Sequence, residues 1–157
     1  MTNLHNFRKD YMQDTLSISE VDQNPIIQFE KWMQEAILSE VVAEPNAMTL
    51  VTSTPDGKPS ARVVLLKSFN EEGFVFFTNY ESRKAIELIK NPHSSIVFDW
   101  HMMERQVRIE GVAKKVSEEE SDKYFYSRPK GSQIGAWVSP QSTFIDGREE
   151  LEARQAK

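Results

Sequence analysis

Apolar residues near the start of the chain recur at the spacing of an α-helix. One face of such a helix is hydrophobic, with apolar residues at Ile26, Phe29, Met33, Ala36 and Ile37. Asn24-Pro25 stands directly before this run. Asparagine is a favoured N-cap residue, and proline is tolerated in the first helical turn. The pattern therefore predicts a helix that begins at Pro25 and ends near Glu40.

From Met48 onward the helical spacing gives way to short runs rich in Val, Leu, Phe and Thr. Such runs are typical of strands when turn residues separate them. Turn signals stand at Pro55-Asp56-Gly57 and at Asn70-Glu71-Glu72-Gly73, so the first three runs are predicted to form hairpins. The five predicted strands are residues 48–54, 61–68, 73–79, 94–100 and 105–116.

A short helix is predicted at residues 81–90, with Asn79 or Ser82 as its cap and Asn91-Pro92 at its end. Its inward-facing residues would be Ala85, Ile86 and Ile89. This is the one connection of helix length before residue 94, so antiparallel strands are favoured over a parallel sheet with alternating helices. The predicted fold class is α+β, mainly β, with a small antiparallel barrel and helices around it.

The last third of the chain is predicted to be mostly helical. Ser117-Glu118-Glu119-Glu120 fits the capping box, which indicates a helix that runs to about Arg128. Pro129-Lys130-Gly131 would break that helix, and residues 134–139 are expected to be strand-like or irregular. A charged helix is predicted from about Arg148.

Length and composition restrict the possible functions. The 157 residues, 39% of them hydrophobic, are enough for one domain with a core; we expect an N-terminal arm at 1–23 and a domain at 24–157. The chain has no cysteine, which excludes disulfides and thiolate chemistry, and its three histidines lack metal-ligand spacing. A net charge of −5 argues against broad nucleic-acid binding. We expect a cytoplasmic protein with no metal, nucleic-acid or membrane partner.

Cationic side chains stand beside the predicted strands. Arg62 and Lys67 bracket an apolar run, and Arg83-Lys84 begins the predicted helix at 81–90. Phosphate groups are bound by such donors and by helix N-termini. Residues five apart in a strand point to opposite faces, so Arg62 and Lys67 would meet one ligand only at a rim, a bulge or a subunit boundary. The alternative is that these are surface charges that protect an edge strand.

Other polar residues are suited to a planar ligand. Tyr124 and Arg128 stand four apart, on one face of the predicted helix, and could hold a second phosphate. Gln106 and Gln141 could supply amide groups to a heteroaromatic ring. The chain has no glycine-rich nucleotide loop, GxSxG or HExxH motif, and the sequence indicates no catalytic side chain.

Several stretches also match a known family, in the order that the family has them. They are FRKDY (7–11), RVVLLK (62–67), FFTNYESRKA (76–85), FDWHMMERQVRIEG (98–111) and KYFYSRPKGSQIGAWVSPQS (123–142). In these stretches the chain resembles the pyridoxine/pyridoxamine 5′-phosphate oxidase family. The resemblance implies an FMN-binding split β-barrel that works as a homodimer, with FMN at the subunit interface. It also implies that pyridoxine or pyridoxamine 5′-phosphate is oxidised by O2 to pyridoxal 5′-phosphate, with release of H2O2.

The resemblance also implies roles for individual residues. The implied FMN contacts are Arg62, Val63, Val64, Leu65, Leu66, Lys67, Phe77, Thr78, Arg83, Lys84, Gln106, Gln141 and Ser142. The implied substrate contacts are Arg8, Lys9, Asp10, Tyr11, Lys67, Tyr124, Arg128 and Ser132. Among the first set, Arg83 and Lys84 would hold the FMN phosphate, and Gln141 and Ser142 would come from the other subunit. Many relatives have tyrosine where Phe77 stands.

The chain departs from the family pattern at its end. Family members continue beyond the position of Lys157 with an Arg-x-His motif that contacts FMN and substrate, so the chain is expected to be a fragment or a shortened relative that lacks this dimerisation segment. Alternatives to the oxidase are therefore a non-catalytic FMN-binding module and another split-barrel flavin oxidoreductase. A dimeric barrel whose cations are only surface charges is the structural alternative.

Overall fold

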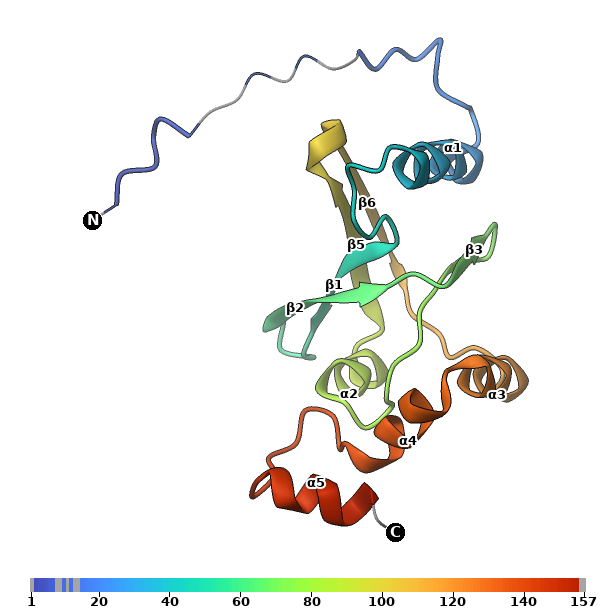
Figure 1. Cartoon of the computed structure of the whole chain (residues 1–157). Coiled ribbons are helices and arrows are strands. Elements are labelled where there is room, and N and C mark those ends of the chain that lie inside the picture. The colour runs from blue at the N-terminus through green and yellow to red at the C-terminus, as the bar shows by residue number, and fades with distance from the viewer. Residues whose placement is uncertain (1, 8–9, 11, 13–14, 156–157) are drawn as a thin grey trace. The chain divides into compact units, whose positions relative to one another are not determined.

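Strands occupy the middle of the chain, and helices stand before, between and after them (Figure 1). The computed structural model describes residues 2–7, 10, 12 and 15–155. The helices are α1 (Pro25–Leu38), α2 (Arg83–Lys90), α3 (Glu118–Ser127), α4 (Lys130–Val138) and α5 (Arg148–Gln155), with a 3-10 turn η1 (His101–Met103). The strands are β1 (Ala47–Ser53), β2 (Pro59–Leu65), β3 (Ser68–Asn70), β4 (Gly73–Val75), β5 (His93–Trp100) and β6 (Arg105–Val112).

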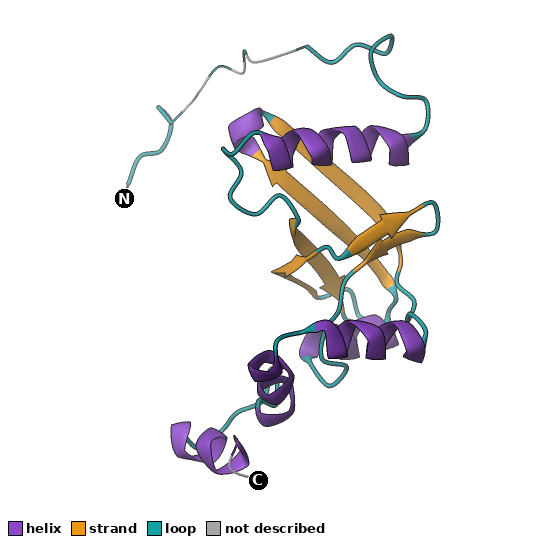
Figure 2. Ribbon diagram, turned by 45° about the vertical axis from the view of Figure 1, so that its right-hand side comes forward, coloured by secondary structure: helices purple, strands orange, loops and turns teal. Residues whose placement is uncertain are grey.

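The described strands form a four-stranded sheet in the order β2-β1-β5-β6 and a separate β3-β4 hairpin (Figure 2). β1 pairs antiparallel with both of its neighbours, so Leu50 lies opposite Arg62 on one side and Ile96 on the other. The predicted antiparallel α+β fold class is confirmed. The third predicted strand is shorter than expected, because β4 ends at Val75 and residues 76–79 leave the hairpin.

The chain divides into two units. The first unit comprises residues 1–46 and 98–107. The Asn24 side chain caps α1 by accepting a hydrogen bond from the backbone N–H of Ile26 at 2.8 Å, as predicted. Phe29 on α1 packs against two buried rings of β5, with centroid distances of 5.0 Å to Phe98 and 6.0 Å to Trp100. These aromatic rings anchor α1 in its unit.

The second unit comprises residues 47–97 and 108–157. Along β1, Met48, Leu50 and Thr52 are buried and alternate with less buried residues, which is the period of a strand. On α2, Ala85 is buried as predicted, whereas Ile86 and Ile89 are exposed. The prediction for these two isoleucines was wrong, because α2 buries Glu87 in their place.

After β6 the structure confirms one prediction and corrects another. α3 ends at Ser127, next to the predicted end near Arg128, whose backbone is extended (φ −74°, ψ 150°) because a residue before proline avoids the helical region. Residues 134–139 were expected to be strand-like or irregular, but α4 covers most of them. Pro129 precedes α4 as its N-cap, and its carbonyl accepts the Ser132 N–H at 2.8 Å. The proline that ends one helix therefore stands at the start of the next.

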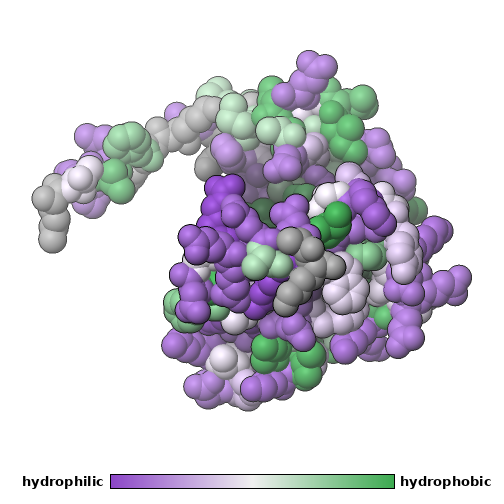
Figure 3. Space-filling view, turned by 60° about the horizontal axis from the view of Figure 1, so that its bottom comes forward, coloured by the Kyte–Doolittle hydropathy of each residue, from purple (hydrophilic) through white to green (hydrophobic). Residues whose placement is uncertain are grey.

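Seen from the side of α4 and α5, the surface is mainly hydrophilic, with separate hydrophobic groups (Figure 3). Trp137 of α4 and Phe144 of the following loop are among the exposed apolar side chains. None of the helices in the described part of the chain is long and apolar enough to cross a membrane.

Candidate functional site

A buried carboxylate, Glu87, connects α2 to β1 and β2. Glu87 Oε2 accepts hydrogen bonds from Thr52 Oγ1 and from Ser60 Oγ, the latter at 2.6 Å. Glu87 Oε1 accepts a hydrogen bond from Arg83 Nε at 2.8 Å, and Arg62 Nη2 lies 3.4 Å from Oε2. We call these five residues the Glu87 network. It brings together two predicted FMN contacts, Arg62 and Arg83.

Oxygen atoms of the protein hold the Arg62 side chain. Arg62 Nη1 donates to Thr52 Oγ1 at 2.6 Å, to the Ser60 carbonyl at 3.2 Å and to the Leu50 carbonyl at 3.3 Å. Arg62 Nη2 donates to Ser60 Oγ. Because a guanidinium has no acceptor, the two hydroxyl groups direct their own protons to Glu87. Thr52 and Ser60 thus each link the guanidinium to the carboxylate.

The charge of Glu87 is set by two opposing effects. Burial would raise its pKa, because a carboxylate loses solvation inside the protein. Hydrogen bonds from Ser60, Thr52 and Arg83, together with the positive charge of Arg83, outweigh burial and lower the pKa from 4.5 to about 2. Glu87 is therefore ionised at neutral pH and offsets part of the positive charge of the two arginines.

A second group of polar side chains lies at the start of α2. Lys84 Nζ donates to Gln141 Oε1 at 2.8 Å and to Ser82 Oγ at 3.3 Å. Thr78 Oγ1 lies 3.5 Å from the same Gln141 oxygen. We call these four residues the Lys84 cluster. It unites three predicted FMN contacts, and Gln141, which was expected from the other subunit, reaches Lys84 of its own chain.

Positive charge is concentrated at the Lys84 cluster. Burial lowers the pKa of Lys84, and the nearby charge of Arg62 lowers it further. Ser82 is the N-cap of α2, yet its hydroxyl accepts no hydrogen bond from a backbone N–H of the first turn in the described part of the chain. The Ser117 hydroxyl of α3, by contrast, accepts one from the Glu120 N–H at 3.1 Å. An anion at the start of α2 would meet the charges of Lys84 and Arg62. It would also meet backbone N–H groups in the first turn that no side chain caps.

An aromatic stack joins a predicted FMN contact to a predicted substrate contact. The rings of Phe77 and Tyr124 lie 3.8 Å apart at an angle of 5°, and Lys67 Nζ lies 5.9 Å from the Tyr124 ring centroid. Two further predicted substrate contacts, Arg128 and Ser132, follow at the end of α3 and in the first turn of α4. Three of the predicted substrate contacts therefore lie on α3 and at the start of α4.

The remaining predicted site residues are distributed as follows. Val63, Val64 and Leu65 lie on β2, and Leu66 after it is buried. Gln106 is an exposed residue of β6 in the first unit, and Ser142 is exposed in the loop before α5 with a left-handed backbone (φ 65°). Asp10 is exposed, and Arg8, Lys9 and Tyr11 lie outside the described residues.

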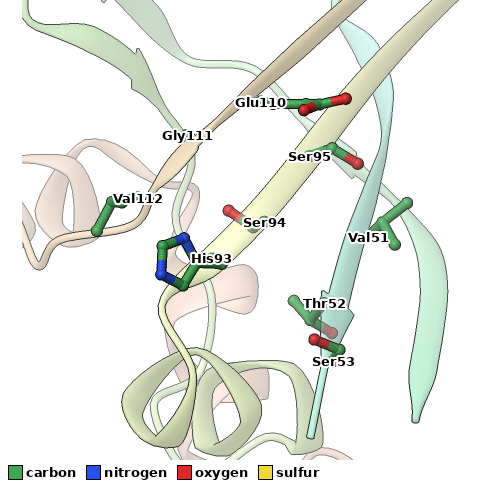
Figure 4. Close-up of a pocket in the computed structure, with 9 residues that line it drawn as sticks. All are labelled: Val51, Thr52, Ser53, His93, Ser94, Ser95, Glu110, Gly111 and Val112. Carbon is green, nitrogen blue, oxygen red and sulfur yellow. The ribbon is translucent and has the colours of Figure 1, made fainter. Parts of the chain in front are cut away.

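We consider two open cavities among the described residues of the second unit. One, of about 490 Å³, lies along β1, β5 and β6 and is lined by residues such as His93, Ser95 and Glu110 (Figure 4). It contains none of the predicted site residues. The other, of about 650 Å³, is lined by Arg83 and Ser142 of the predicted FMN set. The second cavity is thus the one that coincides with the sequence prediction.

Sequence reasoning missed the residues that organise the cations. Glu87, Thr52 and Ser60 were not among the predicted site residues, although Glu87 follows Arg83 at the i,i+4 spacing of helix ion pairs. That spacing is also common on exposed helix faces, so it does not distinguish a buried carboxylate. The hydroxyls of Thr52 and Ser60 carry no signal in the sequence that links them to α2.

Comparison with known proteins agrees with this geometry. The sequence model of a family described as pyridoxamine 5′-phosphate oxidase matches residues 33–157. A pyridoxine/pyridoxamine 5′-phosphate oxidase of Nostoc sp. is 62% identical over 147 residues, which are 94% of this chain and 68% of that protein. Pyridoxine/pyridoxamine 5′-phosphate oxidase 1 of Ralstonia nicotianae is 55% identical over 157 residues, all of this chain and 74% of that protein.

Solved structures show the same relationship at the level of the fold. PhzG from Burkholderia lata, in complex with tetrahydrophenazine-1-carboxylic acid, superposes with a TM-score of 0.84 at 32% identity over 91% of this chain and 71% of that one. A pyridoxamine 5′-phosphate oxidase-related, FMN-binding protein of Nostoc punctiforme matches with a TM-score of 0.62 at 19% identity, over 84% of this chain and 73% of that one. The split-barrel fold that the resemblance implies is therefore confirmed, and the chain belongs to the pyridoxamine 5′-phosphate oxidase family of oxidoreductases.

Proposed function

We propose that this protein is an FMN-dependent oxidase that converts pyridoxamine or pyridoxine 5′-phosphate to pyridoxal 5′-phosphate. The observation that carries the proposal is the 2.8 Å hydrogen bond from Lys84 to Gln141, two residues that stand 57 positions apart in the sequence. It brings two separate family motifs, FFTNYESRKA and the end of the stretch at 123–142, to one place. A chance match of short motifs would give no such convergence.

The residues present fit the phosphate of FMN. Lys84 and Arg62 concentrate positive charge beside the first turn of α2, and the lowered pKa of Lys84 reflects both its burial and that neighbouring charge. A phosphate dianion would relieve the repulsion and accept hydrogen bonds from the first-turn N–H groups. When bound, FMN would take up the electrons and the hydrogen from the substrate's C4′ carbon and pass the electrons to O2, which yields H2O2.

The substrate side of the proposal depends on Tyr124, Arg128 and Ser132. In this arrangement Tyr124 and Arg128 would donate hydrogen bonds to the phosphate of the vitamin, and Lys67 would add a positive charge. The Phe77 ring would fix the plane of Tyr124 through the stack. The role of these residues is to bind and orient; no general base is needed from the protein if the substrate's amine or hydroxyl proton passes to water.

Titration of FMN into the purified chain, followed by quenching of flavin fluorescence, tests the cofactor assignment. Lys84→Gln should weaken FMN binding by about 2–5 kcal/mol, roughly 30-fold or more, because it removes a charged contact to the phosphate. Lys90→Gln is the matched control, since it removes the same charge from the last turn of the same helix. Equal affinities for both variants and the wild type would refute the phosphate site.

The oxidase assay tests the substrate assignment. Arg128→Ala should raise the KM for pyridoxamine 5′-phosphate and leave FMN affinity unchanged, with H2O2 formation as the readout. Unchanged kinetics would exclude Arg128 as a substrate contact. Bound FMN without H2O2 formation, and without flavin bleaching by substrate under anaerobic conditions, would favour the non-catalytic flavin-binding module instead.

A second candidate function is the oxidation of another ring system. It is favoured by the likeness to PhzG, whose structure holds tetrahydrophenazine-1-carboxylic acid. The two functions differ in the anion that the site must bind, because a vitamin phosphate requires the Tyr124, Arg128 and Ser132 donors. A panel of phosphorylated and carboxylated ring substrates, compared by kcat/KM, would separate them.

The proposal includes a cytoplasmic homodimer with FMN between the subunits. It is supported by the position of Gln106, which the resemblance assigns to the flavin ring and which is an exposed residue of β6. Size-exclusion chromatography with light scattering, with and without FMN, would test the assembly. A monomer that binds one FMN with full affinity would refute the interface site.

A further inference from the structure

The Glu87 network buries an ionised carboxylate in a position that stability alone does not explain. Glu87 is 4% exposed and is surrounded by four side chains that donate hydrogen bonds or a positive charge to it. Burying an ion pair carries a desolvation penalty that often cancels its Coulombic gain, so such a pair contributes little net stability. What the network does provide is a fixed geometry for two guanidinium groups.

The two arginines are held in different ways. Arg83 is bound through Nε alone, its side chain is 57% exposed, and neither of its Nη groups donates a hydrogen bond to another described residue. Arg62 is bound through both Nη groups and is mostly buried. Glu87 thus orients Arg83 while leaving its terminal donors available, and it keeps the charge of Arg62 next to Lys84.

We propose that Glu87 is a positioning residue for phosphate binding: through Thr52 and Ser60 it fixes Arg62, and directly it fixes Arg83, so that both cations are oriented before the phosphate of the cofactor arrives. This inference rests on the proposed function and assigns a role to a residue outside the predicted contact set. Orienting long cationic side chains in advance lowers the entropic cost of binding, which otherwise opposes affinity.

The sign of the effect distinguishes positioning from simple electrostatics. Glu87 is negative, so its charge alone repels a phosphate, and Glu87→Gln should then tighten phosphate binding. If Glu87 acts by positioning, the same substitution loosens Arg62 and Arg83 and weakens binding. The two explanations therefore predict opposite changes in the dissociation constant of FMN.

The experiment compares FMN with riboflavin, which has the same ring system without the phosphate. For Glu87→Gln we expect the dissociation constant of FMN to rise about tenfold or more, the size expected for a weakened charged hydrogen bond, and that of riboflavin to stay within about twofold. Ser60→Ala keeps the Glu87 charge but removes one of its donors, so it should weaken FMN in the same direction by a smaller factor. Glu81→Gln removes an exposed carboxylate just before the same helix and reports the effect of charge alone.

Each outcome bears on the proposal. Equal or tighter FMN binding in Glu87→Gln would overturn it, and so would equal losses for FMN and riboflavin, which would indicate a general structural defect. If Glu87→Gln does not fold, Ser60→Ala decides, and unchanged FMN affinity in that variant overturns the proposal. The wild-type chain tests the proposed function separately: if it binds FMN no better than riboflavin, the phosphate site itself is refuted.

Discussion

Phe98→Ala should lower the free energy of unfolding by about 3–5 kcal/mol. Phe98 lies on β5 and is 0% exposed. Its ring packs against two other aromatic side chains, with centroids 5.0 Å from Phe29 and 5.6 Å from Trp100. The substitution would therefore leave a cavity at the centre of the cluster that anchors α1.

The magnitude follows from the area and the ring contacts that are lost. Replacing a buried phenyl ring by a methyl group exposes or vacates on the order of 100 Å² of apolar surface, about 2.5 kcal/mol at 25 cal/mol per Å². Each lost aromatic pair adds about 0.5–1.5 kcal/mol. Partial collapse of the cavity offsets some of this sum, which brings it into the stated range.

Urea unfolding followed by circular dichroism measures this difference. Phe144→Ala is the matched control, because it removes the same atoms from a side chain that is fully exposed. We expect the control to stay within about 0.5 kcal/mol of the wild type. A loss below about 1.5 kcal/mol in Phe98→Ala, or equal losses in the two variants, would refute the assignment of this cluster as the core of its unit.

Three other substitutions test local features of the structure. Ser117→Ala should cost about 1 kcal/mol of stability in urea unfolding, because it removes the cap on the Glu120 N–H, and an unchanged midpoint would contradict the cap. Phe77→Leu should raise the dissociation constant of pyridoxamine 5′-phosphate roughly 2- to 10-fold by calorimetry, since the stack on Tyr124 is lost; an equal rise for unphosphorylated pyridoxamine would count against that reason. The pKa of Glu87 is lowered from 4.5 to about 2 in the folded protein, so protonation of Glu87 makes the wild type less stable as the pH falls from 4.5 toward 2. Glu87→Gln should therefore lose less stability than the wild type between pH 4.5 and pH 2, as measured by the midpoints of urea unfolding at these two pH values. Equal losses of stability in the variant and the wild type would refute the pKa assignment.

The sequence determined the elements whose signals are local. Asn24 and Ser117 mark the starts of α1 and α3 because a cap side chain bonds to N–H groups within three residues of itself. The two turns and most of the strands followed in the same way from turn residues and short apolar runs, but β3 (Ser68–Asn70) was not predicted as a separate strand. Family motifs also predicted FMN contacts, and three of these residues, Thr78, Lys84 and Gln141, lie together at the start of α2, although Gln141 was expected from the other subunit.

Local signals gave wrong predictions at two places, the segment after Pro129 and the buried face of α2. Pro129 predicted the end of α3 correctly, but the same proline also precedes α4, and the prediction of a strand-like segment at 134–139 was wrong. The helical period on α2 likewise predicted Ile86 and Ile89 inside. A buried carboxylate is costly unless donors surround it, and nothing near Glu87 in sequence shows that β1 and β2 supply them.

What only the tertiary structure decided is the arrangement of side chains that are far apart in sequence. The stack of Phe77 on Tyr124 and the bonds of Glu87 to Thr52 and Ser60 depend on the path of the backbone between them. Caps and turns act over a few residues, and hydrophobic periodicity reports only which face of an element is buried. The distance and direction between two side chains on different elements are fixed by the packing of those elements, which the sequence pattern does not contain.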